Sequence, residues 1–63
     1  MSDFKQRLKT ERIELEEKLN KLNEFNLSER VNEVGADQKS LLLIQAGAMF
    51  TYLECLKARL ERL

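Results

Sequence analysis

The residues of this chain best suited to chemistry are arginines close to an aromatic side chain. Gln45, Tyr52 and Arg59 follow one another at seven-residue spacing, so a helix would place them on one side, about two turns apart. An aromatic ring near guanidinium groups can stack a base and hold a phosphate. The pattern is typical of a site for an anionic, nucleotide-like molecule, and the alternative for Tyr52 is ordinary core packing.

The chain has no residue set for catalysis or metal binding. It contains no histidine, the single cysteine Cys55, and two glycines, Gly35 and Gly47. A Ser-His-Asp or Cys-His set therefore cannot form, zinc lacks its usual ligands, and there is no glycine-rich phosphate loop. We expect a protein that is not an enzyme and has no catalytic residues, metal or cofactor.

Two helices must position the candidate residues. Leucines at seven-residue spacing predict a helix over about 3–25 (Leu8, Leu15, Leu22), and a longer apolar seam predicts a second over about 38–62 (Leu42, Ala46, Met49, Leu53, Leu56, Leu60, Leu63). The sequence therefore predicts one all-α domain over 1–63, an antiparallel helical hairpin.

Residues 26–37 are expected to form a short helical elbow between the helices. Ser28 can cap a turn that runs through Val34, with Val31 and Val34 pointing inward. Gly35 suits a backbone with positive φ, and Asp37 can cap the second helix.

The second helix has more apolar surface than one partner helix can cover. Beside its seam runs an apolar stripe, defined by Leu41, Ile44, Ala48, Tyr52 and Cys55. A chain of 63 residues cannot bury a helix that is apolar nearly all round. We expect a homo-oligomeric helical bundle, in which Cys55 is either a small buried hydrophobic residue or a reactive thiol.

The charges balance but are unevenly placed. Net charge is zero, which does not predict binding to long nucleic acid or to an anionic membrane.

The N-terminus lacks a signal-peptide core and the longest apolar run, 41–44, is too short to span a bilayer. These features predict a cytoplasmic protein.

In a hairpin the two termini lie at the same end, which we call the open end. The open end would be basic, while the elbow end would be acidic.

Four bases lie in the first three turns of the first helix, where the helix dipole disfavours them: Lys5, Arg7, Lys9 and Arg12. Together with Arg59 they could form an anion site at the open end. The alternative is that the bases serve solubility and interact favourably with the helix dipole. This explains Lys57, Arg59 and Arg62 at the C-terminal end of the second helix, but it does not explain the four bases at the start of the first helix.

Three motifs resemble a family of very short, phage-encoded hairpin proteins named after a crAss-like phage member. They are FxxRL (Phe4, Arg7, Leu8), ELEEKLxKLxxF from Glu14 to Phe25, and LLxxQxxAMxxYLxxLxxRL from Leu41 to Leu60. The resemblance implies the hairpin fold and a phage origin. The chain departs from the family at Phe4, where a tyrosine is frequent, and at Val31, where phenylalanine is.

Phages also use small helical-hairpin oligomers as sponges for the signals of CBASS and Thoeris immunity, and this likeness of architecture suggests a function. We expect a counter-defence sponge in the host cytoplasm that sequesters a cyclic nucleotide or a cyclic ADP-ribose isomer. Its ligand would lie in pockets between subunits, where Arg7, Arg12 and Arg59 hold phosphates, Tyr52 or Phe4 stacks a base and Gln45 donates or accepts a hydrogen bond. The alternatives are a small interaction module that docks on and inhibits a host protein, and a purely structural coiled coil.

Overall fold

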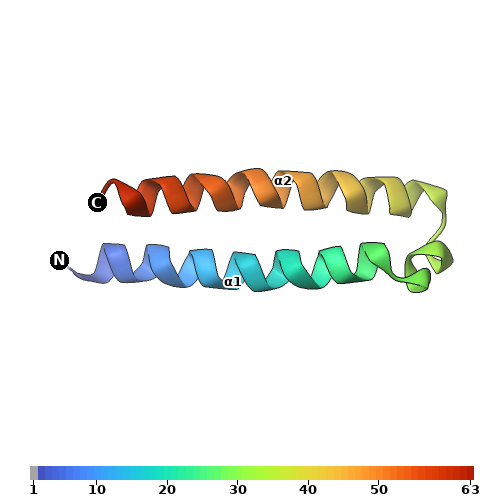
Figure 1. Cartoon of the computed structure of the whole chain (residues 1–63), viewed down its shortest axis with the longest axis horizontal. Helices are drawn as coiled ribbons and strands as arrows, with labels where there is room; N and C mark the ends of the chain where they lie inside the picture. The colour runs from blue at the N-terminus through green and yellow to red at the C-terminus, as the bar shows by residue number, and fades with distance from the viewer. Residues whose placement is uncertain (1) are drawn as a thin grey trace.

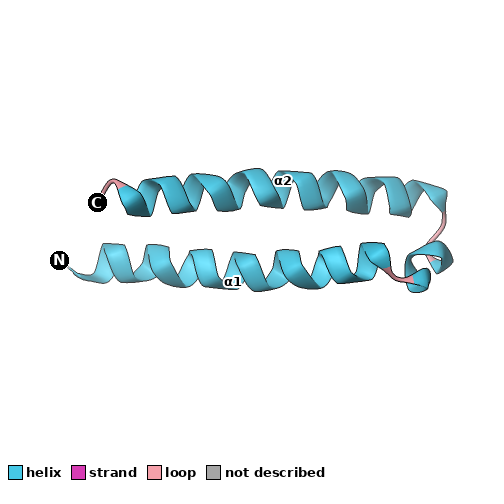
Figure 2. Ribbon diagram, viewed as in Figure 1, coloured by secondary structure: helices cyan, strands magenta, loops and turns pink. Residues whose placement is uncertain are grey.

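The computed structural model describes residues 2–63 and shows an antiparallel helical hairpin. Its elements are α1 (Ser2–Leu27), the 3-10 helix η1 (Glu29–Glu33) and α2 (Ala36–Glu61). The molecule is an elongated rod of 47 × 14 × 13 Å, with both termini at one end and η1 at the other (Figure 1). Loop is confined to short segments beside η1 and at the C-terminus (Figure 2). The all-helical hairpin is confirmed, with helices that reach two residues further into the elbow on each side than predicted.

A strip of leucines joins the two helices. The buried core consists of Leu8, Leu15 and Leu19 from α1 with Leu53 and Leu56 from α2, and Ala46, Met49 and Leu60 pack against it. This strip follows the predicted seven-residue spacing, because residues at i, i+3, i+4 and i+7 share a helix face. Leu63 is an exception. It lies beyond the last residue of α2 and is 58% exposed, so its predicted place in the seam is wrong.

Ser28 is the N-cap residue of η1, but its hydroxyl bonds back to the end of α1. Its hydroxyl donates to the Phe25 carbonyl oxygen at 2.7 Å, and its backbone N–H donates to the same oxygen at 3.1 Å. Carbonyls in the last turn of a helix have no partner within the helix, so this contact satisfies one of them. The predicted N-cap position of Ser28 is confirmed, whereas a capping bond from its hydroxyl to η1 is absent because the hydroxyl is used at the end of α1.

Gly35 connects η1 to α2 with φ +92° and ψ 159°. This conformation is essentially restricted to glycine, so the predicted positive φ is confirmed. Its carbonyl accepts the Lys39 N–H at 3.0 Å and thereby begins α2. Gly35 is therefore the N-cap, and the prediction that Asp37 caps α2 is wrong. Asp37 lies in the first turn, where a carboxylate still interacts favourably with the helix dipole.

The elbow is packed through one valine and two polar contacts. Val31 is buried, whereas Val34 is 37% exposed, so only one of the two predicted inward valines is buried. The Asn26 side-chain amide donates to the Leu42 carbonyl at 3.3 Å, and the Lys39 ammonium donates to the Asn32 amide oxygen at 2.9 Å. These contacts fix how α2 leaves the elbow.

Candidate anion-binding groove

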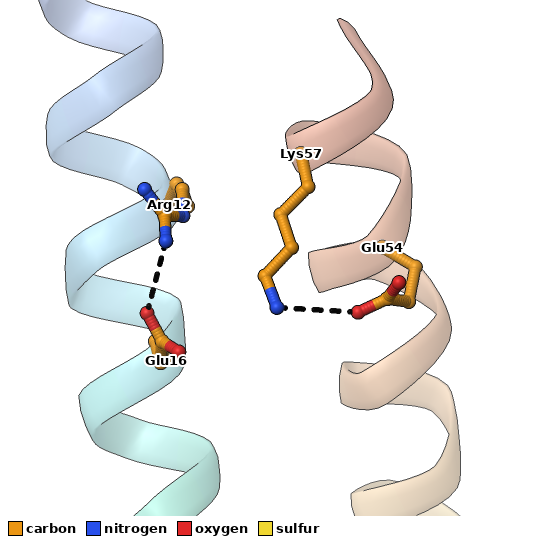
Figure 3. Close-up of polar contacts among 4 residues, drawn as sticks. All are labelled: Arg12, Glu16, Glu54 and Lys57. Carbon is orange, nitrogen blue, oxygen red and sulfur yellow. Dashed lines mark hydrogen bonds and ion pairs between the residues drawn. The ribbon is translucent and has the colours of Figure 1, made fainter. Parts of the chain in front are cut away.

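A shallow groove of about 430 Å³ lies between α1 and α2 near the open end of the hairpin. Arg12 lines it from α1, and Lys57, Leu60 and Glu61 line it from α2. Arg12 and Lys57 come from the sides of the two helices that face each other (Figure 3). The groove therefore combines two cations, an apolar wall and one carboxylate.

Each cation of the groove is paired with a carboxylate on its own helix. An Arg12 guanidinium nitrogen (Nη2) is 3.7 Å from a Glu16 carboxylate oxygen, and the Lys57 ammonium is 3.4 Å from a Glu54 carboxylate oxygen (Figure 3). Each pair lies within one helix and is about half exposed, where such pairs contribute little. Both cations can therefore exchange these carboxylates for an incoming anion at small cost.

Arg12 also has an unsatisfied donor. Its Nε is buried and has no hydrogen-bond partner. A buried donor without an acceptor is unfavourable, and an unpaired one in a folded protein calls for an explanation such as a missing ligand. The Asn26 amide oxygen is likewise buried without a partner, and it lies outside the groove. A phosphate in the groove would contact the solvent-exposed part of the Arg12 guanidinium, since the Arg12 side chain is 39% exposed. Of the six residues predicted to bind a ligand, Arg12 is the one that lines the groove.

The hairpin separates Arg12 from the other predicted arginines. Arg7 precedes Arg12 by five residues, which turns its side chain ~140° away on α1. Arg59 follows Lys57 by two residues, or ~200° around α2. Both arginines are exposed, and neither lines the groove. The predicted meeting of Arg7, Arg12 and Arg59 at one site therefore does not occur within a single hairpin.

The remaining predicted ligand contacts lie on exposed surface outside the groove. Phe4 is 52% exposed and Tyr52 is 46% exposed. Gln45 is exposed, and its amide is 3.9 Å from the Met49 sulfur. Tyr52 lies outside the leucine core of the single hairpin, so its alternative role in core packing would require a second chain and stays a prediction. These residues are free to contact a ligand or another chain.

Sequence reasoning missed Lys57, which it assigned to dipole matching. Lys57 follows the fully buried Leu56 and lies one turn from Leu53 and Leu60. A lysine next to buried leucines lays its apolar stem along the boundary between the two helices and keeps its ammonium in solvent. That position relative to the seam is the signal that could have identified it.

An arginine and an aromatic ring also meet at the elbow, where none was predicted. The Arg30 guanidinium lies 5.7 Å from the centre of the Phe25 ring, within range of a cation–π interaction. The two residues line a smaller hollow of about 260 Å³, together with Lys21, Glu24 and Ser28. Two bases and one acid line this hollow, the same balance as in the larger groove, but its Arg30 guanidinium already lies over the Phe25 ring.

Most of the apolar side chains of α2 are exposed in the hairpin. The exposed fractions include Leu41 56%, Leu43 57%, Ile44 67% and Phe50 55%, and Cys55 is exposed as well. An 18-residue window of α2 has a mean hydropathy of 1.3, so by length and composition this helix could cross a membrane. The sequence prediction had considered only the uninterrupted run 41–44. A buried role for Cys55 requires an additional chain.

The chain matches one family over nearly its whole length. No curated protein and no solved structure matches it. The phage origin and the link to a crAss-like phage member stay predictions. A family model described as Sequestin matches residues 2–62. The chain therefore belongs to the Sequestin family.

Proposed function

We propose that this protein is a non-catalytic sponge, a homo-oligomer of hairpins that sequesters a small anionic nucleotide without cleaving it. The observation that supports this most directly is that Arg12 and Lys57, from different helices, line one groove. The name of the Sequestin family is compatible with sequestration.

The groove has the size and chemistry for part of a nucleotide. Its volume of about 430 Å³ falls in the range of small-molecule sites, ~300–1,000 Å³. Arg12 and Lys57 would hold phosphate oxygens, and Leu60 offers an apolar surface to a sugar or base. The Glu61 carboxylate can accept a hydrogen bond from a ribose hydroxyl, and it disfavours a second phosphate at that edge.

The biological ligand in this proposal is a cyclic nucleotide or a cyclic ADP-ribose isomer used as an immune signal. Such molecules combine phosphates, ribose hydroxyls and bases, which matches the groups that line the groove. A phage that expresses the protein in the host cytoplasm would thereby blunt CBASS or Thoeris immunity. Binding without turnover is sufficient for this role, which agrees with the absence of a histidine from the sequence.

Calorimetry against cyclic di- and trinucleotides and cyclic ADP-ribose isomers tests the proposal. Arg12→Gln and Lys57→Gln should each weaken binding about ten- to a hundredfold, because a charge-assisted hydrogen bond contributes ~1.5–3 kcal/mol. Lys18→Gln is the matched control, since Lys18 is an exposed cation on α1 outside the groove. Arg7→Gln reports whether the other face of the hairpin takes part.

Absence of heat from every member of the panel would contradict the sponge. The alternative function is then a small interaction module that docks the exposed apolar side chains of α2 on a host protein and inhibits it. Ile44 at 67% exposure and Phe50 at 55% favour this alternative. Native mass spectrometry of protein purified from infected cells separates the two, because it detects a retained nucleotide or a retained host protein.

A further inference from the structure

The apolar stripe of α2 is symmetric in sequence about Ala48. Ile44 and Tyr52 lie four residues to either side of it, and Leu41 and Cys55 lie seven residues to either side. The stripe is exposed along its whole length. Beyond it, eleven residues from Ala48 in each direction, are Asp37 and Arg59, which carry opposite charges.

We propose that a second copy of this chain covers the stripe, with the two α2 helices antiparallel and a two-fold axis at Ala48. A two-fold interface is made by the same surface on both copies, so each residue meets its mirror position about the axis. Ala48 meets Ala48, where the small side chains allow close approach. Ile44 of each copy meets Tyr52 of the other. This inference rests on the homo-oligomer of the proposed function and specifies its interface.

Sizes and charges along the stripe are complementary in this arrangement. The large Leu41 lies opposite the small Cys55, and Asp37 lies opposite Arg59 at both ends. A parallel pair would instead place Asp37 beside Asp37 and Arg59 beside Arg59, and like charges facing each other across an interface are unfavourable. It would also bring together the two basic open ends, which carry seven bases against four acids over residues 1–12 and 54–63.

The exposed apolar surface of α2 is buried more favourably against a second chain than in a lipid bilayer. α2 is apolar enough to span a membrane, but the leucine core fastens α1 along most of its length. α1 exposes charged side chains through its middle turns, among them Glu14, Glu17 and Lys18. A spanning α2 would carry these charges to the same depth in the bilayer, where each is costly.

The antiparallel pair determines where the ligand grooves lie. The α2 helices form the centre and the α1 helices lie outside. Because each hairpin is 47 Å long and the two point in opposite directions, the Arg12–Lys57 grooves lie at opposite ends of the pair. Arg59 then belongs to the contact between copies and not to the ligand site.

Disulfide trapping with Leu41→Cys tests the arrangement. Residues 41 and 55 of one chain are ~21 Å apart along the helix, too far for a disulfide, which needs Cα atoms within ~7 Å. A Leu41→Cys chain should therefore form a covalent dimer through Cys55 of the second copy on mild oxidation. Leu41 is 56% exposed, so the substitution leaves the core intact.

Two controls make the result decisive. Wild type should give little covalent dimer, because antiparallel packing keeps the two Cys55 thiols apart, and Leu41→Cys combined with Cys55→Ser should give none. Efficient cross-linking of either control would show a parallel pair and overturn the proposal. A Leu41→Cys chain that stays uncross-linked and sediments as a monomer at micromolar concentration would also overturn it. Neither outcome depends on ligand binding, which calorimetry measures separately.

Discussion

The two long helices are equal in length and opposite in how they use their apolar residues. α1 and α2 each have 26 residues. α1 places most of its leucines on one strip that faces α2, and the exposed large apolar residues elsewhere on it are Phe4 and Ile13, both 52% exposed, and Leu27 at its end, 89% exposed. α2 buries Leu53 and Leu56 against that strip and exposes apolar residues on its other sides. The difference indicates that one side of α2 folds the hairpin while the other sides await partners. Mutation should therefore separate folding from association.

The largest effect is expected from Leu56→Ala. Leu56 is completely buried between the helices, and truncating a buried leucine costs ~2–5 kcal/mol of the free energy of unfolding. In so small a domain this should unfold much of the population at any protein concentration. Urea denaturation followed by circular dichroism measures the loss.

Ile44→Ala is the matched control for Leu56→Ala on the exposed side of α2. Ile44 is 67% exposed in the hairpin, so its truncation should cost stability only at concentrations where copies associate. The loss should vanish on dilution. Equal, concentration-independent losses for both variants would show that folding and association cannot be separated.

A smaller effect is expected from Gly35→Ala in the elbow. A Cβ at this position would meet no atom within 4 Å, so space is not the constraint. The backbone at φ +92° is unfavourable for any L-residue other than glycine, and such strain costs ~1–3 kcal/mol. Thermal unfolding should show a lower midpoint with unchanged helix content. An unchanged midpoint would mean that the elbow relaxes to another conformation.

The smallest effect, with the opposite sign, is expected from Gly47→Ala. Gly47 lies in the middle of α2 with open space around it, and alanine favours a helix over glycine by ~0.8–1.0 kcal/mol. Its position points ~100° away from Ala48 around the helix, to one side of the stripe. The variant should therefore be more stable and associate as before. Dissociation of the oligomer in sedimentation equilibrium would instead place the interface over Gly47.

The sequence was sufficient to predict the hairpin because each helix repeats its leucines independently of the other. It was less informative about helix ends. The Ser28 hydroxyl can bond backward to α1 or forward to η1, and the choice depends on the path of the elbow. Gly35 was identified by its backbone freedom, but its place at the start of α2 required knowing where η1 stops.

The candidate site was predicted only in part for a related reason. Seven-residue spacing shows which residues share a stripe within one helix, as for Gln45, Tyr52 and Arg59. It does not show which stripe of α1 faces which stripe of α2. That depends on the relative rotation of the two helices, which the core packing of Leu15 and Leu56 determines. Arg12 was predicted for its charge, whereas Lys57 was missed, although its position beside the core could have identified it.

The polar contacts of the hairpin are unequally distributed along its length, and this has a mechanical consequence. Among the side-chain hydrogen bonds of residues 2–63, the Asn26–Leu42 contact is the one that joins α1 to α2, and it lies next to the elbow. Both ion pairs in this part of the chain stay within one helix. The rest of the contact between the helices is the leucine core, whose apolar contacts are non-directional. A small tilt of α1 against α2 near the open end therefore breaks no hydrogen bond or ion pair of residues 2–63, so the Arg12–Lys57 groove can adjust its width to a ligand at little cost.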